Sequence, residues 1–198
     1  FLKSLGSGLV VAITNKLLGV MGGDGALGAF AIASRLYVAT GMPQTGIVQG
    51  MQPIVGYNFG QGRRDRVLKT RSLALGATVA YGIAACCVCA FAPSALIGLL
   101  SKEGAIVTEG SLALRLLALS YPASGVAIAV AAYFQSIGRA REALALSLGG
   151  ILAVQLPVLI AAAKLGGLFG LWSAEAISDF ILCGLALALL RRSRSEEH

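Results

Sequence analysis

The sequence has little charge and almost no histidine. Of its 198 residues, 13% are charged and 57% are hydrophobic, and the mean hydropathy is +0.81. A soluble domain has roughly 25% charged residues, so this composition excludes a soluble protein and indicates an integral membrane protein. The one histidine is His198, at the last position. A Ser-His-Asp set or a histidine-based metal site inside the chain is therefore excluded.

Long polar connections between the apolar segments are also missing. Without them there is no room for a separate soluble domain, so any function must reside among the helices. The sequence contains no metal-ligand cluster and no phosphate-binding loop. Its four cysteines lie inside apolar runs, and we interpret them as small packing residues in helices: Cys86, Cys87, Cys89 and Cys183. We therefore expect no enzymatic activity, no metal and no cofactor.

What the sequence has in abundance is apolar segments. A bilayer-spanning helix needs ~20 mostly apolar residues, and glycine and charge clusters divide the chain into six such segments. The predicted helices are 2–21, 26–60, 72–100, 111–137, 143–165 and 169–190. The second is longer than a straight span requires, so we expect tilt, a kink or an extension beyond the bilayer. The predicted fold class is an all-α membrane protein in which residues 1–198 form one six-helix bundle.

Basic residues gather in alternate connections. Two lie on one side of the predicted membrane, Lys102 and Lys164. The other side holds ten: Arg63, Arg64, Arg66, Lys69, Arg71, Arg139, Arg141, Arg191, Arg192 and Arg194. Because cytoplasmic loops carry an excess of Lys and Arg, we expect both ends of the chain to be cytoplasmic. The net charge of +7 then reflects orientation in the bilayer, and we expect no nucleic-acid partner.

Ionisable residues at membrane depth are the first candidates for function. A charged side chain at the centre of a membrane helix costs at least ~2.5–3.5 kcal/mol. Glu175 and Asp179 are four residues apart and share one helix face, and Arg35 is predicted at a similar depth. Two interpretations stay open: a structural ion pair between Arg35 and a carboxylate, or a coupling site where a carboxylate binds a cation or proton. Lys16 and Arg115 are interpreted as anchors near the outer boundary.

Polar amides and prolines are the second set of candidates. The amides and phenols line a solute path or tie the helices together, and the sequence leaves both interpretations open. They are Gln44, Gln49, Gln52, Tyr57, Asn58, Gln135 and Gln155. A proline inside a membrane helix frees a carbonyl and creates a bending point. The predicted hinges are Pro43, Pro53, Pro122 and Pro157.

Four stretches carry a family resemblance. They are GGDGALGAFAIASRL at 22–36, QGMQPIVGYNFGQGRRDRV at 49–67, YFQSIGRAREAL at 133–144 and GLWSAEAISDF at 170–180. On these motifs nearly the whole chain resembles the C-terminal half of multidrug and toxic compound extrusion (MATE) transporters of bacteria. The resemblance implies two six-helix lobes around a V-shaped cavity in the cytoplasmic membrane. It also implies export of amphipathic, often cationic compounds coupled to Na⁺ or H⁺ entry, with an N-terminal six-helix half as partner.

The sequence also departs from the family pattern. Some members place an acidic residue on the first and fourth helices of this lobe, where this chain has Lys16 and Arg115 but no acid at depth. A cation site in this half therefore rests on Glu175 and Asp179, or it lies in the other half. The start without methionine, inside an apolar segment, favours part of a longer chain over a dimerising half-transporter. Two further alternatives are a flippase for lipid-linked precursors, which needs a cationic cavity, and a non-transporting remnant.

Overall fold

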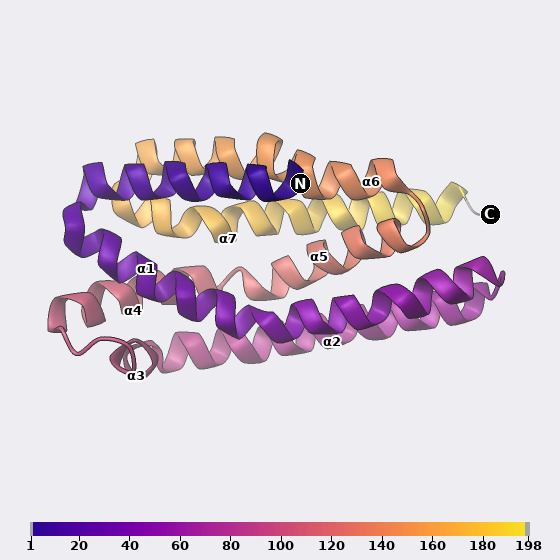
Figure 1. Cartoon of the computed structure of the whole chain (residues 1–198), viewed down its shortest axis with the longest axis horizontal. Coiled ribbons are helices and arrows are strands. Elements are labelled where there is room, and N and C mark those ends of the chain that lie inside the picture. Colours follow the sequence, from indigo (N-terminus) through magenta and orange to yellow (C-terminus); the bar gives the residue numbers. More distant parts are fainter. Residues whose placement is uncertain (1, 197–198) are drawn as a thin grey trace.

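The computed structural model describes the backbone of residues 2–196 and the side chains of residues 5–193. The side chain of Arg194 and the terminal His198 thus lie outside the described residues. All regular structure in the described part is helical (Figure 1). The elements are α1 (Leu2–Gly60), α2 (Arg64–Phe91), α3 (Pro93–Gly98), α4 (Gly104–Ala118), α5 (Tyr121–Ser136), α6 (Ala140–Leu144), the π-helix η1 (Ala145–Gln155) and α7 (Leu156–Glu196). The predicted all-α fold class is confirmed.

The longest helix, α1, contains two membrane segments, and α7 contains the end of one segment, which begins in α6 and η1, and the whole of the next. A straight helix as long as α1 would measure about 90 Å, roughly three times the thickness of the hydrocarbon core. Its geometry breaks at Gly23, with φ 66°, and that of α7 breaks at Gly167, with φ 57°. Glycine adopts this left-handed backbone readily because it lacks a Cβ. Figure 1 shows the chain reversing within both helices.

The number of spans follows from these reversals. By length and composition, three described helices can cross a membrane, or up to four if α4 and α5, which meet at 45°, form one bent span. Dividing α1 at Gly23 and α7 at Gly167 then gives six spans in the described chain. The molecule is thus a six-helix bundle of an integral membrane protein.

The helix bounds differ from the predicted ranges around the third and fourth spans. α2 begins at Arg64 instead of residue 72, with Asp65 in the first turn, where an acidic residue favours helix formation. It ends at Phe91, and α3 starts separately because Ala92 has the non-helical φ of −126°. The basic cluster therefore lies within the first turns of α2 and not in a loop.

The prolines occupy different positions relative to the bends. Pro122 lies in the first turn of α5, directly after the 45° bend between α4 and α5. Its missing N–H is not needed at that position. Pro157 follows η1 as the second residue of α7, whereas Pro43 and Pro53 lie inside α1 without a break in its helical geometry. A hinge function for these four residues stays a prediction.

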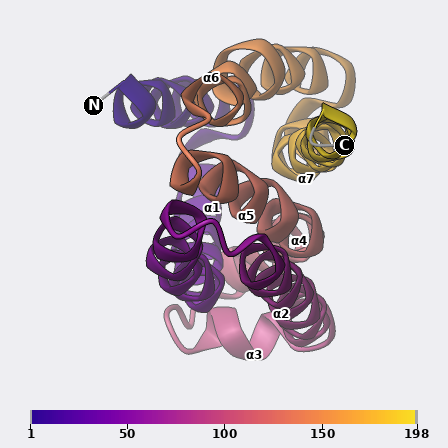
Figure 2. The ribbon, with the colours of Figure 1, turned by 90° about the vertical axis from the view of Figure 1, so that its right-hand side faces the viewer.

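The helices leave a polar layer between two apolar clusters. One cluster packs near α3 and contains Leu18, Ile97 and Leu114. The other packs toward the basic end and contains Val55 and Phe134. Figure 2 shows α5 between the second half of α1 with α2 on one side and the first half of α1 with η1 and α7 on the other. This arrangement brings polar side chains from α1, α5, η1 and α7 together at mid-length of the bundle.

Candidate functional site

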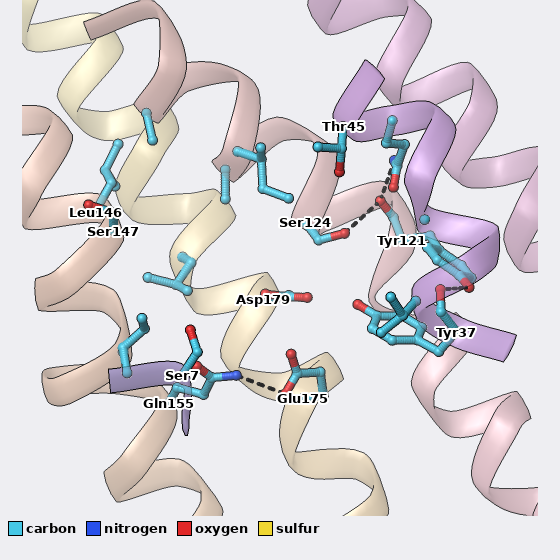
Figure 3. Close-up of a pocket in the computed structure, with 18 residues that line it drawn as sticks. Ser7, Tyr37, Thr45, Tyr121, Ser124, Leu146, Ser147, Gln155, Glu175 and Asp179 are labelled. Atoms are coloured by element: carbon cyan, nitrogen blue, oxygen red, sulfur yellow. Dashed lines mark hydrogen bonds between the residues drawn. The ribbon is translucent and has the colours of Figure 1, made fainter. Parts of the chain in front are cut away.

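A polar cavity of about 340 Å³ lies in this layer (Figure 3). A second cavity of about 430 Å³ adjoins it, and the two share Ser7, Tyr37, Val38, Gln155 and Glu175 as lining residues. Volumes of this size fall within the range of ligand pockets, ~300–1,000 Å³. The polar groups that line the first cavity are Ser7, Tyr37, Gln44, Thr45, Tyr121, Ser124, Ser147, Gln155, Glu175 and Asp179.

Two carboxylates line the first cavity. Glu175 and Asp179 lie one turn apart on α7, both half-buried, and Figure 3 shows them on the same side of that helix. The Gln155 amide nitrogen donates a hydrogen bond of 2.9 Å to a Glu175 carboxylate oxygen. Among the described side chains, a salt bridge lies at the basic end of the bundle, between Arg139 and Glu142 (3.6 Å), and none joins a base to either cavity carboxylate. Neither cavity carboxylate therefore has a basic partner in the described chain.

The structure does not bring Arg35 to these carboxylates. Its side chain is exposed on α1 and lines neither cavity, whereas Tyr37, two residues later, lines both. Residues two positions apart lie on nearly opposite faces of an α-helix. The face that places Tyr37 in the cavity thus turns Arg35 away, and the described structure shows no ion pair between Arg35 and either carboxylate.

The two predicted anchors lie outside the site. Lys16 and Arg115 are exposed and line neither cavity. The Arg115 guanidinium donates a hydrogen bond of 3.1 Å to the carbonyl of Ala90, which joins α4 to the end of α2.

A pair of tyrosines forms one wall of the cavity. The rings of Tyr37 and Tyr121 stack with centroids 4.8 Å apart. The Tyr121 hydroxyl donates to the Tyr37 carbonyl at 2.8 Å, and the Tyr37 hydroxyl hydrogen-bonds with Ser120 Oγ at 2.7 Å. These contacts fix α1 against the bend between α4 and α5. They also hold the Tyr37 ring next to the carboxylates.

Gln44, next to the tyrosine pair, joins the helices α1, α2 and α5. Its side chain is 3% exposed, and its amide nitrogen donates to the carbonyls of Thr78 on α2 and Tyr121 on α5, both at 2.9 Å. Glycine at two facing positions leaves room for it: a Cβ would lie 2.8 Å from this nitrogen at Gly82 and 2.5 Å from it at Gly125. Gln44 therefore serves as a helix tie that also borders the cavity.

The other predicted polar residues separate into three groups. Gln155 lines both cavities. Gln52 instead donates to the side chain of Gln135 at 3.3 Å, and Asn58 donates to the Ile54 carbonyl at 2.8 Å, so these groups make contacts between or within helices. The remaining members, Gln49 and Tyr57, are exposed outside both cavities.

Several lining residues were absent from the predicted set. Tyr37, Thr45, Tyr121 and Ser124 contribute polar groups to the cavity. Part of this set has a signal in the sequence, because Tyr37, Gln44 and Thr45 are separated by seven and eight residues and so share one helix face. Tyr121 and Ser124 depend on the α4–α5 bend and have no comparable signal.

The pattern of the family MatE matches residues 2–160, most of the chain. The chain belongs to the MatE family. MatE proteins are transporters and not enzymes, so the expectation that the chain is not an enzyme is confirmed.

Curated relatives of the chain are named as exporters. It is 27% identical over 194 residues to the multidrug export protein MepA of Staphylococcus saprophyticus, which covers 96% of this chain and 41% of that protein. It is also 27% identical to MepA of Staphylococcus aureus strain MRSA252, with 96% and 41% covered. The chain thus spans about two-fifths of the length of these relatives.

Solved structures share its fold over nearly its whole length. A crystal structure of MATE in complex with MaL6 superimposes with a TM-score of 0.91 at 17% identity, covering 98% of this chain and 44% of that one. The bent form of the Vibrio cholerae MATE transporter VcmN gives 0.89 at 22%, with 98% and 44% covered. A MOP superfamily transporter from Pyrococcus furiosus, described as having reverse polarity of its binding pocket, gives 0.89 at 18%, again with 98% and 44% covered. The bundle therefore has the fold of about half of a MATE transporter.

Proposed function

We propose that this chain is one six-helix half of a transporter that exports amphipathic, cationic compounds in exchange for Na⁺ or H⁺. The observation that carries the proposal is the charge of the cavity. Glu175 and Asp179 line it, and no Lys, Arg or His is among the described residues that line either cavity. An acid at membrane depth costs at least ~2.5 kcal/mol when charged and unpaired, so a bound cation or proton would stabilise it.

The aromatic wall supports an amphipathic cation as the exported compound. A cation over a tyrosine face gains ~0.5–2 kcal/mol, more when the site is dry. Tyr37, which is partly exposed and lines both cavities, offers such aromatic surface beside the carboxylates, and the buried Tyr121 ring supports it by stacking. Apolar side chains such as Ile128 and Leu182 complete the lining, and they suit the apolar part of a drug-like molecule.

A flippase for anionic, lipid-linked precursors is the second candidate, and the cavity disfavours it. Phosphate head groups need basic residues or helix N-termini at the binding site. Arg35 and Lys16 are the nearest candidates in the sequence, and both are exposed and line neither cavity. Because a protein of the same fold is described with a pocket of reverse polarity, the fold alone does not decide the cargo, and the charge of this cavity supports a cation.

The four motifs of the sequence support the C-terminal half as the place of this chain in the transporter. The basic clusters at one end of the bundle support a cytoplasmic location for that end in a bacterial inner membrane. A second in-frame segment of six spans upstream of Phe1 in the gene would test the assignment. The absence of such a segment would favour a dimer of half-transporters.

Transport by the natural full-length protein tests the function. The protein is reconstituted in vesicles, a Na⁺ or H⁺ gradient is imposed, and movement of a fluorescent lipophilic cation is recorded. We expect gradient-dependent transport that falls at least tenfold in Asp179→Asn and in Glu175→Gln, since each removes a charge from the cavity. If the wild-type protein moves no cation under either gradient, the antiporter proposal fails.

A matched control distinguishes the loss of a cavity carboxylate from the loss of an acidic residue elsewhere in the chain. Glu109→Gln removes an exposed acid of α4 that lines neither cavity. This variant should transport at the wild-type rate. Equal losses in Glu109→Gln and Asp179→Asn would contradict a specific role for the cavity carboxylates.

A further inference from the structure

The two cavities lie end to end along the bundle. The residues lining the second cavity alone include Asn15 and Phe30, toward the α3 end, and we name this space the outer chamber. Those lining the first alone include Thr45 and Ser147, toward the basic end, and we name it the inner chamber. The five shared residues lie where the two chambers adjoin, and we name this set the partition.

A single hydrogen bond crosses this partition. Its donor is the Gln155 amide on η1 and its acceptor is the Glu175 carboxylate on α7, 2.9 Å apart (Figure 3). Both residues line both chambers, whereas Asp179, one turn further along α7, lines the inner chamber alone. A cation moving from the outer chamber therefore meets Glu175 before Asp179.

The donor sits at an unusual point of the backbone. η1 is a π-helix of 11 residues that ends at Gln155, and the N–H of Leu156 still bonds five residues back, to the carbonyl of Ile151. The next residue, Pro157, has no N–H to continue the ladder. π-Helices are rare and concentrate at functional sites. If this segment changed to α-helical bonding, Gln155 would rotate relative to the part of α7 that carries Glu175. The two side chains would then separate.

We propose that Gln155 is a positioning residue that closes the partition, and that a monovalent cation, Na⁺ or H⁺, crosses this lobe from Glu175 to Asp179 when Gln155 releases Glu175. The inference rests on the proposed antiport function and adds the order of the sites and the barrier between them. The amide competes with the cation for the same carboxylate oxygen. When the cation has left for Asp179, the ionised Glu175 accepts the Gln155 hydrogen bond again and the partition is closed.

Nothing else that is charged faces this step in the described residues. The uncharged polar groups around the two carboxylates lie on several elements. From α1 and α5 they are the phenols of Tyr37 and Tyr121, the Gln44 amide and the hydroxyls of Ser7, Thr45 and Ser124. The Ser120 hydroxyl and the Cys183 thiol lie near Asp179, and the Ser147 hydroxyl of η1 also lines the cavity. Carboxylates at positions i and i+4 have Cβ atoms ~5–6 Å apart, a gap that one water molecule bridges. For a proton, the transfer leaves Glu175 as a carboxylate and Asp179 as a carboxylic acid, so charge is conserved.

The experiment measures ion entry without an exported compound. Full-length protein is reconstituted in vesicles, and either a ²²Na⁺ gradient at equal pH or a pH gradient without Na⁺ is imposed. The gradient chosen is the one that drives export by the wild-type protein. We expect Gln155→Ala to raise substrate-independent entry roughly tenfold or more, the factor expected for loss of a hydrogen bond to a charged group. Adding Asp179→Asn to Gln155→Ala should return entry to the wild-type level.

Two further variants distinguish loss of the Gln155 hydrogen bond from loss of any amide contact and from failure to fold. Gln61→Ala removes another amide hydrogen bond, the 3.2 Å contact with the Tyr57 hydroxyl outside both chambers, and should not raise entry. If Gln155→Ala does not fold, Gln155→Asn replaces it, because its amide is one methylene too short to keep the 2.9 Å contact. Wild-type entry in the folded Gln155 variant, or entry that persists after Asp179→Asn is added, overturns the inference. Failure of the antiport function itself would show in the wild-type protein, where neither gradient would drive export.

Discussion

Replacing Gln44 with leucine should destabilise the bundle without changing the charge of the cavity. The side chain is 3% exposed and donates two hydrogen bonds of 2.9 Å to carbonyls on α2 and α5. Leucine keeps most of the volume but donates neither bond. Hydrogen bonds between membrane helices contribute ~0.6 kcal/mol on average and ~1.7 at most. Loss of two therefore lowers the free energy of unfolding by about 1.2 kcal/mol, with an upper value of about 3.4 kcal/mol.

The cost should not exceed this upper value, because both carbonyls keep other donors. The Tyr121 carbonyl also accepts the Ser124 hydroxyl at 3.2 Å, and carbonyls inside helices accept backbone N–H groups four residues on. The assay is equilibrium unfolding of the full-length protein in mixed micelles, followed by fluorescence. The matched control is Gln52→Leu on the same helix, whose one exposed amide contact is 3.3 Å long and should contribute less than ~0.6 kcal/mol.

The outcome that would refute this reasoning is an equal effect of the two leucine variants. It would mean that the two buried hydrogen bonds of Gln44 contribute no more to stability than the single exposed contact of Gln52. A larger loss in Gln44→Leu, together with export that still depends on the imposed gradient, would agree with a structural tie bordering the cavity.

Three further predictions concern backbone space and the tyrosine wall. Gly82→Ala should cost about 1–3 kcal/mol, because its Cβ would lie 2.8 Å from a backbone carbonyl, whereas Gly46→Ala, with no atom within 4 Å, should be neutral or stabilising in the same unfolding assay. Gly167→Ala should cost about 1–2 kcal/mol because its φ is 57°, and Gly166→Ala, outside the left-handed region, serves as its control. Tyr37→Phe should keep the ring stack and lose less than ~2 kcal/mol, while a loss of folded protein on purification would contradict this.

The sequence was informative about elements whose cause is local. Apolar runs predicted six helices because each span buries ~20 side chains in lipid or in neighbouring helices. The spacing of Glu175 and Asp179 predicted that their side chains share a face, since residues four apart are neighbours on any α-helix. The structure places both in one cavity. Features that are fixed within one helix can thus be predicted from the sequence.

Features that depend on two helices were not accessible. Similar depth allows Arg35 to pair with a carboxylate, which is one of the two interpretations that the sequence leaves open, but depth does not specify which way α1 is turned. The partner that Glu175 has is Gln155, which is one of six amides in the predicted polar set. The π-helix that positions it has no composition signal in ALSLGGILAVQ, because a leucine- and alanine-rich run fits an α-helix equally well.

The absence of a base beside Glu175 and Asp179 in the described residues bears on whether these carboxylates serve stability or transport. A purely structural role would be served by an arginine within reach, since a buried acid without a partner is costly. This chain carries Arg35 only two residues from Tyr37, yet the helix turns it to the exposed face. What the fold supplies to Glu175 is an amide from η1, a neutral donor that is displaced more readily than a countercharge. An acid held by a weaker, displaceable partner remains available to a mobile cation, which is what exchange of one cation for another across a membrane requires.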